Sequence, residues 1–122
     1  MSLQQDNLHR EYTFNNLLVE SIEKVMNYVL GKHYSDVIFE HMKEKGCKNK
    51  DIPNNLTLFQ RTIHTSIAMH IHPPAPLLLM FIVEELCEKI GIEYDEEKAY
   101  HFIKYVTELK QVYKKEKGGE IR

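Results

Sequence analysis

LLLMFIV, residues Leu77 to Val83, is the stretch of sequence that decides the fold. Seven consecutive apolar residues put hydrophobic side chains on every side of a helix, which is typical of a helix at the centre of a core or shared with a partner. Pro76 suits the first turn of this helix, where no backbone N–H is required. Gly91 follows as a stop signal, so we expect one helix from Pro76 to about Ile90.

Four further segments carry apolar residues at helical spacing, and no segment shows the period-two alternation of a strand. The expected helices run from Thr13 to Gly31, from Ser35 to Gly46, from Asn54 or Asn55 to Pro73, and from Asp95 to about Glu116. Thr13, Ser35 and Asp95 are expected to cap the N-termini of their helices. In the connector before the third of these, Ile52 should be a buried anchor with extended backbone, because Pro53 follows it. The sequence therefore predicts an all-α fold, a compact single-domain bundle of about five helices. A polar arm (1–12) and a mobile tail (117–122) would flank the helical domain (13–116).

Composition narrows the classes of function. A chain of 122 residues with 43% hydrophobic content can bury one core. A net charge of -2 gives no general attraction to nucleic acid or to an anionic membrane. The longest apolar run, Ala75 to Val83, contains a proline and is too short to span a bilayer, and the N-terminus lacks the apolar segment of a signal peptide. We expect a cytoplasmic protein with no membrane partner.

The segment MHIHPPAP (69–76) contains the candidate metal ligands. His70 and His72 lie near His64, and a divalent metal needs three or four ligands converging at about 2 Å. Residues at i and i+2 point apart on a helix, so His70 and His72 converge only if Pro73 forces His72 out of the helix. No carboxylate nearby completes a ligand set. A polar helix end with exposed histidines is favoured over a metal site, and no cofactor is predicted.

His41 and His70 lie on apolar helical stripes. The simpler expectation is a histidine at the edge of the core, hydrogen-bonded to a backbone carbonyl or a tyrosine. The alternative is a pH-sensitive switch, because histidine titrates near pH 6.5.

The two cysteines, Cys47 and Cys87, are far apart and are expected to be free thiols. Cys47 sits in a polar connector expected to be exposed, where Lys48 and other lysines would favour its thiolate. Cys87 falls within an amphipathic helix and is expected to be structural. Neither has a hydrolase signature around it, and no glycine-rich phosphate loop is present. No catalytic residue is predicted, and the sequence favours a non-enzymatic protein.

The C-terminal segment is locally basic from Lys104 onward, with Tyr105 and Tyr113 interleaved among its lysines. Such a surface could contact nucleic acid, but a specific DNA-binding protein normally has a denser basic surface. A solvated helix face is therefore favoured, and nucleic-acid binding is not expected.

Several short motifs occur in a recognisable order: Leu30-Gly31, Phe39 with His41 and Met42, Ile52-Pro53, then Phe59 and a closing apolar helix. This order, over residues 15–92, resembles the Nitrosopumilus output domain, a small helical domain of archaea that occurs alone or attached to predicted signalling proteins. The chain departs from that family at HIHPPAP, where the family has a Phe-Gly and Gly-Ala turn. The resemblance implies an archaeal regulatory or sensory module without established catalytic activity.

Three hypotheses of function follow. The first is a non-enzymatic helical module that acts through protein–protein contacts as a homodimer, with a signalling protein as a further partner. Its interface would be formed by Leu77, Leu78, Met80, Phe81 and Val83. The second is a metal- or small-ligand-binding module that uses His64, His70 and His72. The third is a dimeric DNA-binding regulator that uses the basic C-terminal helix.

Overall fold

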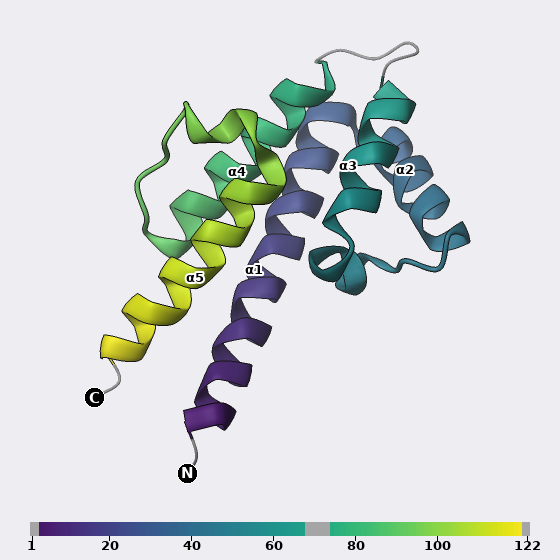
Figure 1. Ribbon diagram of the computed structural model, residues 1–122. Helices are drawn as coiled ribbons and strands as arrows, with labels where there is room; N and C mark the ends of the chain where they lie inside the picture. Colours follow the sequence, from purple (N-terminus) through teal and green to yellow (C-terminus); the bar gives the residue numbers. More distant parts are fainter. Residues whose placement is uncertain (1–2, 68–73, 121–122) are drawn as a thin grey trace.

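The part of the chain that the structure describes folds into five α-helices and two short 3-10 helices (Figure 1). This computed structural model describes residues 3–67 and 74–120, and for 3–10 and 117–120 it describes only the helical backbone. The elements are α1 (Leu3–Leu30), α2 (Lys32–Glu44), η1 (Asn49–Asn54), α3 (Leu56–Ile67), α4 (Ala75–Ile90), η2 (Lys98–Tyr100) and α5 (Phe102–Glu120). No strand occurs within the described ranges, and the predicted all-α single-domain bundle of five helices is confirmed.

Helix α1 lies at the centre of the bundle. It runs between α4 and α5 on one side and α2 and α3 on the other (Figure 1), and it contacts α2, α4, α5 and η1. Its buried apolar side chains recur every three or four residues: Phe14, Leu18, Ile22, Val25, Met26 and Leu30. That spacing forms one stripe on a helix, and α1 therefore carries the apolar surface on which most of the bundle packs.

The start of α1 differs from the expectation. The helix begins at Leu3 and not at Thr13, so the residues expected to form a polar arm are helical from that point. They contain no proline or glycine. The Glu11 carboxylate ties this part of α1 to α5, because it lies 2.6 Å from Lys110 Nζ and 3.9 Å from Lys114 Nζ. The polarity of this segment therefore does not indicate an irregular arm.

Gly31 separates α1 from α2, as predicted. Its backbone adopts φ 84° and ψ 157°, a region that is open almost only to glycine. Helix α2 then starts at Lys32, so the expectation that Ser35 caps this helix is wrong. Ser35 is fully buried in the first turns of α2, and its backbone N–H donates to Gly31 O at 3.0 Å.

The connector after α2 is more ordered than expected. Ile52 is fully buried, which confirms it as the anchor of this segment, but it belongs to the 3-10 helix η1 and not to an extended strand of backbone. Pro53 is also buried within η1. Because η1 contacts α1, α2 and α3, burial of these two side chains outweighs the extended preference of the residue before a proline.

The ends of α4 match the expectation. Pro76 lies in its first turn, and Gly91 ends it in the left-handed region (φ 72°, ψ 29°). The Ile92 N–H donates to Cys87 O at 3.0 Å, which satisfies a carbonyl of the last turn. Helix α5 begins at Phe102 and not at Asp95, as the sequence had indicated. Asp95 Oδ1 accepts the Glu97 N–H at 3.0 Å, so Asp95 caps only the turn before η2.

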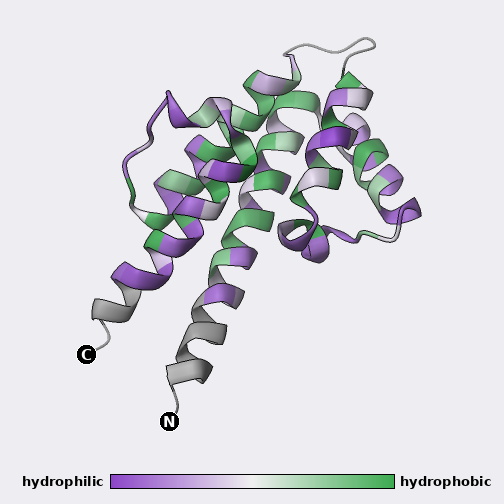
Figure 2. Cartoon of the chain, viewed as in Figure 1, coloured by the Kyte–Doolittle hydropathy of each residue, from purple (hydrophilic) through white to green (hydrophobic). Residues whose placement is uncertain are grey.

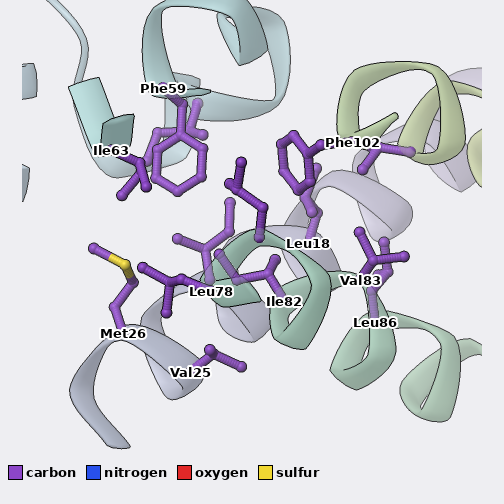
Figure 3. Packing of buried hydrophobic residues seen from close by; sticks show 14 of the residues in the cluster. Leu18, Val25, Met26, Phe59, Ile63, Leu78, Ile82, Val83, Leu86 and Phe102 are labelled. Atoms are coloured by element: carbon purple, nitrogen blue, oxygen red, sulfur yellow. The ribbon is translucent and has the colours of Figure 1, made fainter. Parts of the chain in front are cut away.

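Side chains from all five α-helices form one core. Figure 3 shows part of it, with residues of α1, α3, α4 and α5 labelled. The Phe59 ring of α3 lies 6.1 Å from the Phe102 ring of α5, above Leu78 and Ile82 of α4. Hydrophobic and hydrophilic residues are interspersed along the helices (Figure 2), and the buried core is built from the hydrophobic ones. Within the described residues, no helix combines the length and the apolar character needed to cross a membrane.

The Gly31→Ala variant should lower the free energy of unfolding by about 1–3 kcal/mol. An added Cβ would meet no atom within 4 Å, so the whole effect comes from the backbone conformation. Urea denaturation measures it, with Gly91→Ala as the matched control, since the left-handed conformation of Gly91 costs an alanine about 1–2 kcal/mol. A Gly31→Ala variant as stable as the native chain would contradict this assignment.

The Glu11→Gln variant should lower the free energy of unfolding at neutral pH by about 0.2–1 kcal/mol, because the ion pair is partly exposed. The hydrogen bond from Lys110 holds the pKa of Glu11 below its ordinary value, against a smaller opposing effect of burial. Stabilisation by this carboxylate is present above its unfolded-state pKa and is lost as the pH falls through the lowered folded-state pKa. The difference between variant and native chain should therefore shrink in acid, as measured by denaturation at each pH.

Candidate functional site

Other helices cover most of the surface of α4 and leave one side exposed to solvent. Leu78 and Val83 are fully buried, so they are core residues and are not available to a partner of the folded chain. Leu77 and Phe81 remain 37% and 36% exposed, and Met80 is half-buried. Leu77 and Phe81 are four residues apart and lie on the same face of the helix. Of the predicted interface residues, these two are the ones that face solvent.

A groove between α1 and α4 adjoins this exposed face. It has a volume of about 320 Å³ and is lined by Lys24, Val25, Tyr28, Val29, Phe81, Glu84, Glu85 and Glu88. Val25 is buried and Val29 half-buried, whereas the Tyr28 side chain is 90% exposed. We call this feature the α1–α4 groove. Sequence reasoning missed Tyr28, because it lies outside the apolar stripe of α1; an aromatic residue next to that stripe was the available signal.

The α4 side of the groove is acidic. The Glu85 carboxylate lies 3.0 Å from Lys24 Nζ and 3.8 Å from Lys89 Nζ. Glu84 and Glu88 are exposed and form no ion pair within the described part of the chain. Three glutamates and one lysine line the groove, so its local charge is negative.

Of the candidate histidines, the structure describes His41 and His64. His41 is exposed, so the expectation of a core histidine is wrong there. Helix α2 buries only Ser35, Ile38 and Met42, a narrow stripe that leaves His41 on the solvent side. His64 is exposed beside a small pocket of about 130 Å³. His70 and His72 lie outside the described residues.

No cluster of three or more histidine, cysteine, aspartate or glutamate side chains able to hold a metal occurs within residues 3–67 and 74–120. This leaves His64 as the one candidate ligand that the structure describes.

Both cysteines are free and buried. The expectation that Cys47 is exposed is wrong: its side chain is 2% exposed, and its backbone N–H donates to Met42 O at 2.9 Å as the chain turns after α2. Burial raises the pKa of the Cys47 thiol, and the nearby Asp51 raises it further. Burial likewise raises the pKa of Cys87. These shifts are opposite to those of an activated cysteine nucleophile.

The two tyrosines of the basic C-terminal segment belong to the core. The Tyr105 hydroxyl accepts the Asp95 backbone N–H at 2.7 Å and lies 3.7 Å from Cys87 Sγ, and burial raises the pKa of Tyr105 to about 12. The Tyr113 ring is buried 5.8 Å from that of Phe14. These aromatic rings hold α5 in place and are not available to stack on bases.

A second cavity, of about 520 Å³, lies between α5 and the segment that precedes η2. Tyr94 and Tyr105 stack in its wall with ring centroids 6.2 Å apart. The Lys98 ammonium at this cavity is paired with Glu108 at 3.5 Å. Its walls combine charged side chains with aliphatic and aromatic ones such as Ile92 and Leu109.

No protein family, curated protein or solved structure matches this chain.

Neither cysteine should react rapidly with a thiol-specific disulfide reagent in the native protein, because both are buried and both have raised pKa values. Two thiols should react at once after unfolding in guanidinium chloride. Absorbance of the released thiolate measures both rates. A native-state thiol that reacts as fast as free cysteine would show that one of the two sites is accessible.

Proposed function

We propose that this chain is a non-enzymatic helical module that acts through protein–protein contacts, and that two copies associate through the α1–α4 groove. The observation that carries the proposal is the exposure of Leu77 and Phe81 on a helix whose other leucine, isoleucine and valine side chains are buried. Exposed apolar side chains beside a groove, bordered by charged residues, are the usual composition of a protein-binding surface.

The groove offers more than a single exposed side chain. Phe81 and Tyr28 line it together with Val25 and Val29, so a partner's apolar side chain would be in contact with both helices. Aromatic side chains at the centre of an interface contribute most of the binding energy, while the surrounding polar residues exclude water. Tyr28 and Phe81 are the residues of this kind in the groove.

A regulatory or sensory role, with a signalling protein as partner, is part of the proposal and derives from the resemblance to the Nitrosopumilus output domain. The apolar residues that carry the resemblance are structural: Met42, Ile52 and Phe59 are fully buried, and Leu30 is 8% exposed. They account for packing where α1, α2, η1 and α3 meet, and the binding surface lies on other residues.

Self-association should be weak at low salt and should strengthen as salt is added. Each copy brings three glutamates and one lysine to the groove, so two copies repel each other through these charges. Dissolved salt screens exposed charges over about 10 Å at 0.1 M, which lowers this repulsion.

The Phe81→Glu variant should raise the dissociation constant of the homodimer by at least about tenfold, because a carboxylate replaces the apolar contact and loses its hydration on binding. Analytical ultracentrifugation at increasing protein concentration measures it. Val112→Glu on α5 is the matched control, since Val112 is 37% exposed and Phe81 36%. Circular dichroism establishes that both variants are folded.

A native chain that stays monomeric at all protein and salt concentrations would exclude the homodimer. Equal weakening by Phe81→Glu and Val112→Glu would place the interface elsewhere.

A further inference from the structure

We infer that the α1–α4 groove receives a cationic amphipathic helix of another protein, and that such a helix displaces the second copy. The inference rests on the proposed role of the groove as a protein-binding surface and adds the chemistry of the partner. It is based on the charges around the groove and on how they are already paired.

The charges on the groove are unbalanced in one direction. Glu85 is the one groove glutamate with a cationic partner, since Lys24 and Lys89 lie within 4 Å of it. Glu84 and Glu88 are exposed and have no ion pair among the described residues. Both carboxylates are hydrated and unpaired, so cations brought by a partner could form ion pairs with them here.

The spacing of these carboxylates suits a helix. Glu84 and Glu88 are separated by four residues on α4, so they lie about one helical turn, or roughly 5–6 Å, apart. Lysine or arginine residues at i and i+4 on a partner helix have the same spacing. A helix laid along α4 would therefore place two cations opposite both carboxylates at once.

The apolar part of the groove fits the other face of the same helix. Phe81 precedes Glu84 by one turn, and Tyr28 faces it from α1. A helix that binds in a groove anchors itself with apolar residues at i, i+3 or i+4, and i+7. A partner with an apolar stripe and a lysine- or arginine-rich edge matches both the floor and the acidic side of the groove.

A second copy of this chain lacks that complementarity at the same surface. Its own groove carries the same three glutamates, so pairing groove to groove brings like charges together. A cationic helix instead neutralises Glu84 and Glu88, and opposite charge also speeds the encounter of the two molecules. The cationic helix should thus compete successfully with self-association.

The test uses the full chain and two synthetic peptides of about 16 residues. Both peptides carry the same leucines at i, i+3, i+4 and i+7. One has lysines along the edge of the apolar stripe, and the other has glutamates there. Fluorescence anisotropy of labelled peptide measures binding over a range of salt concentrations. Sedimentation follows the homodimer during a titration at a salt concentration where the homodimer forms.

The lysine peptide should bind at least about tenfold more tightly than the glutamate peptide, should lose affinity as salt is added, and should convert dimer to monomer. The variant with both Glu84→Lys and Glu88→Lys should reverse the preference. These substitutions are at exposed positions and are expected to leave folding intact. Glu40→Lys with Glu44→Lys, an exposed pair of equal spacing on α2, is the charge control and should leave the preference unchanged.

The outcomes separate this inference from the proposed function. Equal binding of both peptides, blocked by Phe81→Glu, would overturn the cationic partner and keep the groove as an interface. A homodimer that forms without binding either peptide would also overturn it and leave the second copy as occupant. No binding of either peptide and no homodimer would overturn both proposals. A peptide preference that survives Glu84→Lys with Glu88→Lys would place the cation site on another surface.

Discussion

The apolar stripe of α1 is the constraint on which the other elements depend. Phe14, Leu18, Ile22 and Met26 are all buried, and α2, α4 and α5 all pack against this one element. Burying a large aliphatic or aromatic side chain contributes about 1.5–3 kcal/mol, whereas an exposed ion pair contributes about 0–1 kcal/mol. The Glu11–Lys110 pair therefore fastens α1 to α5 but does not determine where α1 lies. Loss of the apolar stripe would remove the surface against which α2, α4 and α5 pack.

The position of α1 also determines what α4 leaves exposed. Three helices cover α4, namely α1, α3 and α5, and the uncovered side carries Leu77 and Phe81. Keeping these side chains in water costs free energy that a partner would recover on binding. A cationic partner would neutralise the adjacent glutamates. The same packing thus accounts for the stability of α4 and for the exposed apolar side chains beside the groove.

Sequence reasoning predicted the helix ends that depend on covalent structure and missed those that depend on context. Gly31 and Gly91 end helices because their backbone conformations are unfavourable for other residues, and Pro76 starts one because it lacks an N–H. Ser35 and Asp95 were expected to cap helices, yet one is buried inside α2 and the other caps a short turn. Polar side chains of this kind form local hydrogen bonds in many backbone conformations. Likewise, the polarity of the surrounding residues did not reveal that Cys47 is buried or that α1 begins at Leu3.

By itself, the sequence determined the helical class, the five apolar segments and α4 as the helix with an excess of apolar surface. Periodicity specifies which residues share a face of a helix, and this information is local. Only the tertiary structure decided that Leu78 and Val83 are core residues, that Leu77 and Phe81 face solvent, and that Tyr28 joins them beside Glu84 and Glu88. The physical reason is that burial depends on which distant helix covers a face. That choice depends on packing among α1, α3, α4 and α5, and no single segment encodes it.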